Sequence, residues 1–377
     1  MDARSFGVEE ELLLVEPGTG RARAVAGAVM RAAERQFTVP AGGNGAGGGE
    51  TASDVLGFEL KLEQLEINTK PCCSLDELGR EVRRCRAMAA EAAGRAGVRV
   101  AAVGTSPVPV EPSLTSTPRY RRMAEAFGLT AREQLTCGCH VHVQIASDEE
   151  GVAVLDRIQP WLGPLLALSA NSPFWQGRDS GYASFRYQVW GRWPCSGPTA
   201  WFGSAQAYHD TVQAMVGTNT VLDPGMVYFN ARLSHHYPTI EVRIADVCLA
   251  PDDAVLIAAL VRGLVETEAR AWRASRPAHV VRTELLQLAA WRASRYGVEN
   301  ELIHPLSGRP TPVRAVTGAL LDHVRPVLAE TGDLAVAAGL IDAVLARGNG
   351  AAFQRRIHRT AGNVLDVILG AVDRTCG

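Results

Sequence analysis

The stretch CGCHVHVQI, residues 137–145, alternates two histidines with two valines. A period of two is typical of a β-strand, in which successive side chains point to opposite faces of the sheet. His140 and His142 would therefore share one face, while Val141 and Val143 would face a packed layer behind it. The sequence thus predicts a sheet with one apolar face and one face that carries imidazoles.

Three other segments carry polar side chains where a core-facing strand would carry apolar ones. They are FGVEEELLLV (6–15) with Glu9 and Glu11, GFELKLEQLEINT (57–69) with Glu59 and Glu66, and TIEVRIADV (239–247) with Glu241 and Arg243. Each segment alone has a plain explanation: a solvated strand end, histidines that donate to carbonyls, or a surface ion pair. Four such strands in one chain favour a common site.

The residue types in these segments favour a divalent cation. Burial of a lone charge is strongly unfavourable, whereas several carboxylates beside an imidazole are stable around cations. A set dominated by carboxylates favours Mg²⁺ or Mn²⁺ over Zn²⁺, which prefers more histidine and cysteine. Cys137 and Cys139 flank His140, but on a strand Cys139 points away from His140, which argues against a zinc site there.

The remaining pattern indicates an α+β fold. In SLDELGREVRRCRAMAAEAAG (74–94), Ser74 and Glu77 form a capping box, so a helix is expected to begin there. The other expected elements are a strand ending in a turn over 98–107, a helix over 119–128, and a helix followed by a loop over 156–173. An aromatic- and arginine-rich stretch follows over 174–201, with a loop over 181–194, and amphipathic helices are expected from Pro251 onward. Strands mixed with helices, without regular βαβ spacing, favour α+β over a doubly wound sheet.

No linker divides the chain. The sequence therefore predicts a single domain over 1–377, sheet-bearing over 1–250 and mainly helical over 251–377.

The composition limits the partners that can be expected. The chain has 377 residues, 47% of them hydrophobic, and a net charge of −2, so no nucleic acid is expected to bind. No uncharged apolar run reaches about 18 residues and the N-terminus lacks a signal-peptide layout, so a cytoplasmic protein without a membrane partner is expected. Most of the eight cysteines are expected to be reduced, buried thiols.

Two nucleotide-binding motifs can be set aside. Lys61 and Lys70 are the only lysines and neither lies in a G-K-[ST] motif, so there is no P-loop. Any ATP phosphates would then be held by arginines and metal ions. Gly43, Gly45 and Gly48 form a G-x-G-x-x-G pattern, but it lies in an expected flexible loop with no helical pattern after it, which argues against a dinucleotide site.

Eight longer motifs resemble the glutamate–cysteine ligase type 2 family, whose members are also called carboxylate–amine ligases. In chain order they are GVEEELLLV, EQLEINT, RYRRM…FG, CGCHVHV, LSANSPFWQG, GYASFRYQVWGRWP, RLSHHYPTIEVRIADV and WRASRYGVENELIHPLSG. The resemblance implies a glutamine-synthetase-like fold, with a curved, mainly antiparallel sheet around Mg²⁺ or Mn²⁺. It also implies ATP-dependent amide formation through an acyl-phosphate.

The resemblance further implies roles for single residues. The implied metal ligands are Glu9, Glu11, Glu59, Glu66, His140 and Glu241, the implied ATP-binding residues are His142, Arg232 and Arg243, and the implied catalytic residues are Glu66, His142 and Arg243. Arg186, in the aromatic-rich stretch, is expected to hold an amino-acid carboxylate, with Arg232 as a second candidate. Tyr187 and Asn171 complete the expected substrate-binding set. Relatives often carry an acid where this chain has Asn230, which leaves its amine acceptor and rate open.

The chemistry of amide formation explains these residue types. A carboxylate is a poor electrophile, and its phosphorylation brings two anions together, which divalent cations and bidentate arginines stabilise. The expected function is an ATP-dependent ligase that forms an amide of the γ-glutamyl-cysteine type, an acid–amino-acid ligation, from small-molecule carboxylate and amine substrates. Members of the family include proteins with weak or unassigned activity.

Two alternatives stay open. A metal-dependent hydrolase that uses His140 and His142 would need a third strong ligand, and adjacent His235 and His236 cannot both point inward from an extended segment. A degenerate ligase fold would bind an amino acid or a nucleotide as a regulator; the intact acids argue against it, although Asn230 leaves room. The sequence identifies neither the two substrates nor the oligomer, for which a homodimer is one option.

Overall fold

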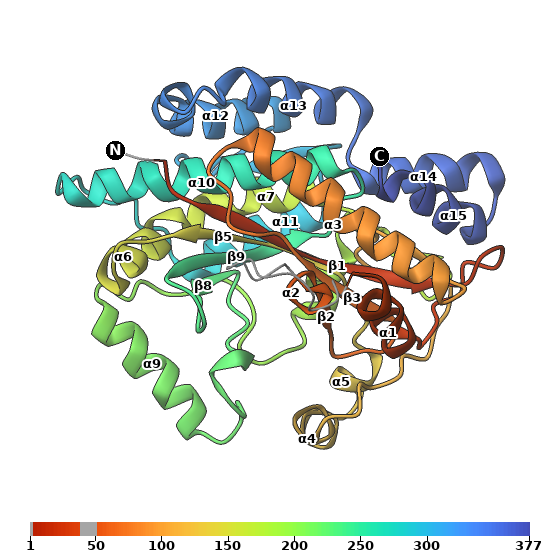
Figure 1. The fold of residues 1–377 in the computed structure, drawn as a ribbon. Helices are drawn as coiled ribbons and strands as arrows, with labels where there is room; N and C mark the ends of the chain where they lie inside the picture. The colour runs from red at the N-terminus through yellow and green to blue at the C-terminus, as the bar shows by residue number, and fades with distance from the viewer. Residues whose placement is uncertain (1–2, 38–50) are drawn as a thin grey trace, which may run out of the picture.

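Seven strands form one antiparallel sheet in the computed structural model, which describes residues 3–37 and 51–377 (Figure 1). The strand order is β2-β3-β1-β5-β9-β8, and β4 pairs with the C-terminal end of β1. The strands are β1 (Phe6–Val15), β2 (Leu56–Phe58), β3 (Gln64–Asn68), β4 (Arg99–Ala101), β5 (Gly138–Gln144), β8 (Ala231–Leu233) and β9 (Thr239–Asp246). The expected α+β class and antiparallel sheet are confirmed.

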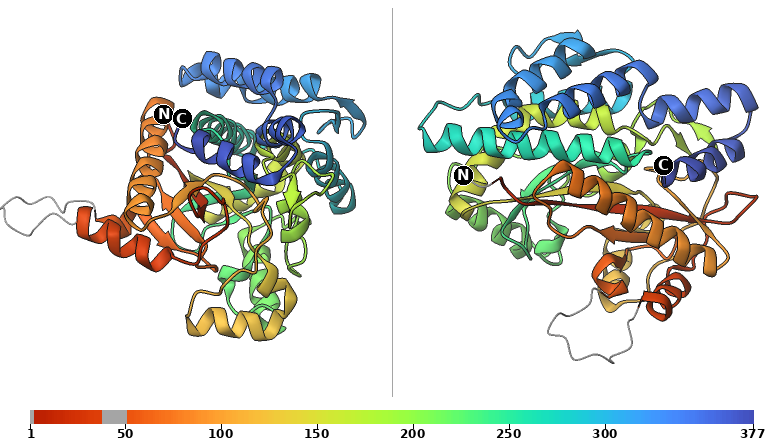
Figure 2. Two further views of the ribbon diagram at one scale, coloured as in Figure 1. Left: turned by 90° about the vertical axis from the view of Figure 1, so that its right-hand side faces the viewer. Right: turned by 45° about the horizontal axis from the view of Figure 1, so that its top comes forward.

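Helices cover one face of this sheet. Figures 1 and 2 show α10 (Pro251–Arg273) crossing above the sheet beside α3 (Leu75–Arg95) and α7 (Leu162–Ser169), with α12 and α13 above them. By contrast, α4, α5 and α9 lie below the sheet in Figure 1. The remaining helices are α1 (Ala26–Phe37), α2 (Ala52–Val55), α4 (Pro118–Phe127), α5 (Leu129–Glu133), α6 (Asp148–Ile158), α8 (Phe185–Trp190), α9 (Ala205–Gly217), α11 (Thr283–Tyr296), α12 (Val313–Glu330), α13 (Leu334–Arg347), α14 (Gly350–Ala361) and α15 (Val364–Thr375). Short 3₁₀ helices η1 (Gln159–Trp161) and η2 (Pro224–Met226) and the small hairpins β6–β7 (Phe174–Trp175, Arg178–Asp179) and β10–β11 (Glu301–Ile303, Pro310–Pro312) complete the elements.

The apolar side chains of the strands point toward α10. Val141 and Val143 of β5 are fully buried and belong to one core cluster with Val242 of β9 and with Leu256 and Leu260 of α10. This confirms the alternation that the sequence predicts for β5. Because the valines occupy the helix-covered face, the histidines between them lie on the other face of the sheet.

One ion pair is buried on the helix-covered face. Glu10 of β1 accepts two hydrogen bonds from Arg86 of α3, at 2.6 and 2.8 Å, and both side chains are almost completely buried. The same guanidinium donates to the carbonyl oxygens of Cys248, Leu249 and Thr375. Arg86 thus ties α3 to β1, to the end of β9 and to the C-terminal helix.

Several expected elements are shorter than the sequence predicts. The strand expected over 57–69 is interrupted between β2 and β3, where Gln64 N–H donates to Lys61 C=O in a turn. The strand expected over 98–107 is limited to β4. The helix expected over 156–173 is divided by η1, which contains Pro160, and proline cannot donate an intrahelical hydrogen bond. The Gly43–Gly48 motif lies outside the described residues.

One helix begins at the capping residue that the sequence predicts, and another forms inside an expected loop. Ser74 accepts a hydrogen bond from Glu77 N–H at the start of α3, while the Glu77 carboxylate accepts from Cys73 N–H. The stretch 174–201 is not all loop, because α8 forms within it and Ser184 caps its first turn. Arg186 and Tyr187 are therefore helical residues.

One stretch in the described part of the chain, residues 334–361, is long and apolar enough to be compared with a membrane span. The structure divides it at Gly348, which has a φ of 83°, into α13 with 14 residues and α14 with 12. Neither helix alone reaches the ~20 residues that a bilayer core requires.

Candidate functional site

A cavity of about 540 Å³ lies on the face of the sheet opposite α10. We call it the central cavity. Its lining contains every residue that the sequence predicts as a metal or ATP ligand: Glu9, Glu11, Glu59, Glu66, His140, His142, Arg232, Glu241 and Arg243. Residues from four separate parts of the sequence therefore meet in one place.

The register of the sheet brings these side chains together. Across β1 and its neighbours, Glu11 pairs with Glu66 and Glu9 pairs with His140. Because all of them point to the same face, directly opposite side chains lie about 5 Å apart at Cβ. The sheet thus forms two polar rows side by side.

A third row involves the last two strands. Glu241 of β9 pairs with His142 on one side and with Arg232 on the other. Between the pairs Cys139–Ala245 and Val141–Val242, one residue of β5 faces two of β9, which is a β-bulge. Alternation from Glu241 puts Arg243 on the cavity side, next to the bulge and beside His140.

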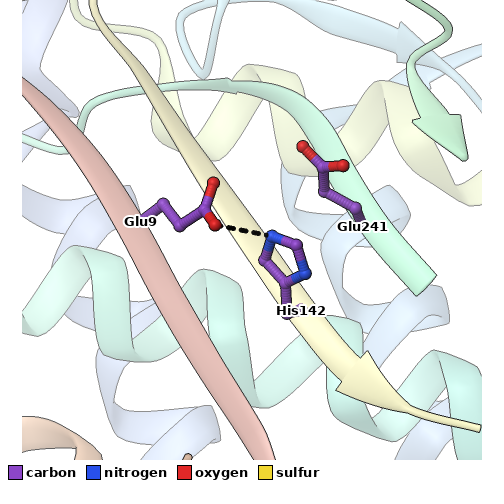
Figure 3. A group of neighbouring side chains, drawn as sticks. All are labelled: Glu9, His142 and Glu241. Carbon is purple, nitrogen blue, oxygen red and sulfur yellow. Dashed lines mark ion pairs between the residues drawn. The ribbon is translucent and has the colours of Figure 1, made fainter. Parts of the chain in front are cut away.

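The ion-paired part of the cavity is centred on Glu9. Its carboxylate lies 3.1 Å from His142 Nε2 (Figure 3). It also lies 3.4 Å from His140 Nδ1. Glu9, His142 and Glu241 also form a group whose potential ligand atoms all lie within 4.8 Å of one another. The family resemblance implies His140 as the metal-ligating imidazole and His142 as an ATP-binding residue. Among the described residues, this geometry groups His142 with the two acids.

The pKa values in this part follow from its opposite charges. Burial alone would raise the pKa of Glu9, but hydrogen bonds and charge from His140 and His142 lower it well below its ordinary value. For Glu241, too, burial acts upward and is outweighed by Arg243 and Arg232, so its pKa is lowered. The pKa of His142 is raised because the Glu9 contact exceeds the effect of burial. These residues therefore form a network of opposite charges.

The other part of the cavity holds three acids, Glu11, Glu59 and Glu66, which we call the acidic trio. Within the described part of the chain, no ion pair joins any of the three to a basic side chain. Burial, followed by the charges of Glu11 and Glu66, raises the pKa of Glu59 well above its ordinary value, and burial also raises that of Glu66. The trio is a cluster of like charges without a protein counter-ion.

The two cavity arginines are held in different ways. Arg232 donates to Glu241 at 2.6 Å and to the carbonyl oxygens of Gly225 and Val227. Arg243 also pairs with Glu241, lies 3.5 Å from His140 Nδ1, and places its guanidinium 5.9 Å from the Trp190 ring centroid. Its buried Nε has no hydrogen-bond partner. Both arginines thus border the space above Glu241.

The three predicted substrate-binding residues are not in the cavity lining. Arg186 is almost completely buried, 3.9 Å from Asp246, and its guanidinium stacks 5.6 Å from the Trp190 ring centroid. A Cβ at Gly138 would lie 2.2 Å from Arg186 Nη2, so this glycine leaves room for the guanidinium beneath the sheet. Arg186 therefore lies on the His140 side of the sheet, buried beside the cavity and outside its lining.

Asn171 and Tyr187 also have other positions. Asn171 is fully buried and donates to the carbonyl oxygens of Ala102 and Val247. Tyr187 borders a separate pocket of about 400 Å³ between α8 and α11, and its hydroxyl accepts a hydrogen bond from Asn230. Asn171 thus hydrogen-bonds to backbone groups and Tyr187 lines another pocket, and the substrate roles of Arg186, Tyr187 and Asn171 stay predictions.

The lining includes residues for which the sequence predicted no role in the site. Arg119 and Tyr120 come from α4, Asp223 and Tyr228 from the segment around η2, and Trp193 from the turn after α8. The motif RYRRM was the one available signal for the first two. The segment 223–228 carries no periodicity that would reveal it, because its position depends on tertiary packing.

Comparisons with known proteins give matches along nearly the whole chain. A family model for glutamate–cysteine ligase family 2 matches residues 5–374. A Streptomyces avermitilis protein that carries the provisional name glutamate–cysteine ligase 2-1 is 52% identical, over 99% of this chain and 100% of its own. A Frankia alni protein with the provisional name glutamate–cysteine ligase 2-2 is 49% identical, over 97% and 95%.

Solved structures show the same fold at low sequence identity. The glutamate–cysteine ligase of Francisella tularensis, in complex with AMP, has a TM-score of 0.69 at 13% identity, over 100% of this chain and 90% of that one. The bifunctional glutathione synthetase of Pasteurella multocida has a TM-score of 0.68 at 15% identity, over 100% and 52%. The motifs first seen as a resemblance are thus matched along nearly the whole chain, and the protein belongs to glutamate–cysteine ligase family 2.

Proposed function

We propose that the protein is an ATP-dependent carboxylate–amine ligase that forms an amide of the γ-glutamyl-cysteine type through an acyl-phosphate. The observation that carries this proposal is the meeting of the acidic trio with the Glu9–Glu241 network and two arginines in one cavity. Family membership and the names of the relatives support the same reaction. The substrates would be small carboxylic acids and amines, with amino acids as the first candidates.

The cavity residues fit divalent cations. Burial and the charges of Glu11 and Glu66 raise the pKa of Glu59, and burial raises that of Glu66. Among the described residues no ion pair joins the acidic trio to a basic side chain, and hard oxygen ligands are those that Mg²⁺ and Mn²⁺ prefer. Glu11, Glu59 and Glu66 would hold one ion. Glu9 and Glu241, with His140 or His142, would hold a second. Bound there, the ions would offset the repulsion between the nucleotide phosphates and the substrate carboxylate.

The cavity arginines would bind the phosphates. In the reaction a substrate carboxylate oxygen bonds to the γ-phosphorus while the bond to ADP breaks. The amine nitrogen then bonds to the acyl carbon, loses a proton, and releases phosphate. Arg243 and Arg232 lie where a planar guanidinium could hold two phosphoryl oxygens, and their contacts with Glu241 orient them.

The alternative functions have less support in the structure. A hydrolase centred on His140 and His142 could take Glu9 or Glu241 as a third ligand, since His235 and His236 lie exposed at the rim. Such a reaction would leave the acidic trio and the two arginines without a role. A regulator that binds without catalysis would not need the uncompensated acidic trio. Asn230 donates to the Tyr187 hydroxyl, and its backbone carbonyl accepts a hydrogen bond from Arg243 N–H. An amide at this position therefore leaves the acids of the cavity in place. Cytoplasmic location, a single domain and a homodimer stay predictions.

ADP release tests the proposal. The purified chain would be incubated with ATP, Mg²⁺ and pairs of amino acids, and the mass of any product determined. We expect ADP release that requires both an acid and an amine, with an amide product lighter by one water than its two substrates. A Glu11→Gln variant serves as the inactive control. ADP release without any amide product, across all pairs, would contradict a ligase.

A further inference from the structure

The central cavity contains an ion pair that the proposed chemistry does not use. Arg119 of α4 donates to Asp223 through Nε at 2.7 Å and through Nη2 at 2.9 Å. Both residues line the cavity, and their side chains are 35% and 33% exposed, compared with 25% for Glu9 and 3% for Glu241. The pair thus lies at the rim, where a ligand would enter.

This pair lies at the end of the cavity that holds the acidic trio. Tyr120 and Tyr228 both line the space, and the Arg119 guanidinium lies 5.7 Å from the Tyr120 ring centroid. Burial raises the pKa of Tyr228 to about 12, and the charges of both Arg119 and Glu59 act on its hydroxyl. Glu59, Arg119 and both tyrosines thus line one cavity, and the two charges lie close enough to act on both hydroxyls.

The backbone leaves space next to the pair. A Cβ at Gly225 would lie 2.9 Å from Asp223 Oδ1 and 3.3 Å from Arg119 Nη2. Any other residue would crowd both charged groups. The same segment is tied to the polar rows, because Gly225 C=O accepts a hydrogen bond from Arg232. The two charges are thus held in a defined place beside the phosphate-binding arginine.

A half-exposed pair can exchange partners at low cost. Ion pairs in contact with water contribute little to stability, because solvent competes with both groups. The buried Arg86–Glu10 pair has no such freedom. A ligand that brings its own carboxylate and its own cation can therefore replace each partner at Arg119 and Asp223.

We propose that Arg119 and Asp223 bind the α-carboxylate and the α-ammonium group of the acid substrate. An α-amino acid carries both charges on one carbon, and the guanidinium can grip its carboxylate with two hydrogen bonds. Held at the rim in this way, the substrate would extend a second, side-chain carboxylate toward the acidic trio for phosphorylation. The site thus selects an amino acid with an acidic side chain over a plain dicarboxylic acid. This inference rests on the proposed function.

The test compares two ligands that differ by one charge. Calorimetry on the full chain with Mg²⁺ would measure the binding of L-glutamate and of glutarate, which lacks the ammonium group. We expect Asp223→Asn to weaken glutamate about tenfold or more and glutarate less than about twofold. Arg119→Gln is expected to weaken both ligands, because both present a carboxylate to it.

A matched variant controls for the loss of a rim ion pair. Arg192 pairs with Glu133 at 2.6 Å, with side chains 34% and 47% exposed, and neither residue lines the central cavity. Arg192→Gln should leave both affinities unchanged. If the Arg119–Asp223 pair only fastened α4 in place, Asp223→Asn would weaken both ligands equally. That result, or a wild-type protein that binds glutarate as tightly as glutamate or does not bind glutamate, would overturn the inference.

The inference and the proposed function can fail separately. Binding requires no turnover, so the expected affinity pattern without any ADP release would refute the ligase and leave the head-group site intact. Turnover of glutamate by the wild type, with an unchanged preference over glutarate in Asp223→Asn, would refute the head-group site alone.

Discussion

Glu11 of β1 and Glu66 of β3 lie directly opposite each other across their ladder, both on the cavity side of the sheet. Like charges in this relation destabilise a sheet, and Glu59 adds a third. The residue before Glu11 behaves in the opposite way, because Glu10 points to the helices and pairs with Arg86. The fold therefore tolerates repulsion only on the face where we propose that cations bind.

Replacing Glu66 by glutamine should separate function from stability. Glu66→Gln removes one charge from a repelling group, so the melting temperature should stay the same or rise while ligase turnover falls at least about 10²-fold. Turnover and thermal unfolding would be measured on the same sample. Near-normal turnover would remove Glu66 from the site.

Glu10→Gln is the matched control on the opposite, helix-covered face of the sheet. It leaves Arg86 buried without a carboxylate, so it should destabilise the fold by about 3–5 kcal/mol. The protein that stays folded at low temperature should keep its turnover. Glu10→Gln should thus lower stability and keep turnover, whereas Glu66→Gln should keep stability and lower turnover.

Metal removal tests the ligand set. Activity should require millimolar Mg²⁺ or Mn²⁺ and disappear with EDTA, because five of the six predicted metal ligands are carboxylates. Activity would be followed while each metal is added back to a stripped sample. Full recovery with Zn²⁺ alone would be incompatible with an oxygen-dominated site.

Much of the cavity face could be predicted because strand periodicity is local. The alternation in β5 and β9 places His140, His142, Glu241 and Arg243 on one side without any knowledge of the fold. The sequence could not show that Arg186 is buried against Asp246, since a buried ion pair and a substrate clamp use the same residue type. The choice between these two roles is tertiary, because it depends on which segments pack around the guanidinium.

The contact between Arg119 and Asp223 at the rim of the cavity could not be predicted from the sequence, for another reason. Arg119 and Asp223 are 104 residues apart and meet only because α4 and the segment before η2 pack around a shared aromatic cluster. Neither segment has a strand or helix pattern that specifies this contact. In a chain with 36 arginines, one further arginine also gave little signal.

The acid stability of the fold should depend on Glu150. Burial alone would raise its pKa, but hydrogen bonds from Arg4 and from Ala146 N–H lower it below the ordinary 4.5. As pH falls below that value, the unfolded state binds the proton first, so this contribution to the free energy of unfolding is lost on acidification. Urea unfolding at several pH values should show the advantage of wild type over Glu150→Gln shrinking below about pH 4.5. A constant difference would contradict the assignment.

Arg243 provides the test of the acyl-phosphate mechanism. Its guanidinium pairs with Glu241, lies beside His140 and stacks near Trp190, so it is oriented before any ligand binds. Arg243→Lys keeps the charge and loses the planar fork that can hold two phosphoryl oxygens. Stabilisation of charge that rearranges during transfer should suffer more than the binding of ATP itself. We therefore expect kcat to fall on the order of 10²-fold, with a smaller change in the KM for ATP.

The stability of the same variant decides between catalysis and structure. Glu241 keeps a second partner in Arg232 at 2.6 Å, so loss of the Arg243 fork should lower the melting temperature only slightly. A structural role would give the reverse pattern, with a clearly lower melting temperature and a kcat near that of wild type. Because both quantities come from one purified sample, a destabilised but fully active variant would remove Arg243 from the phosphate-binding residues, and Arg232 would be the arginine to test next.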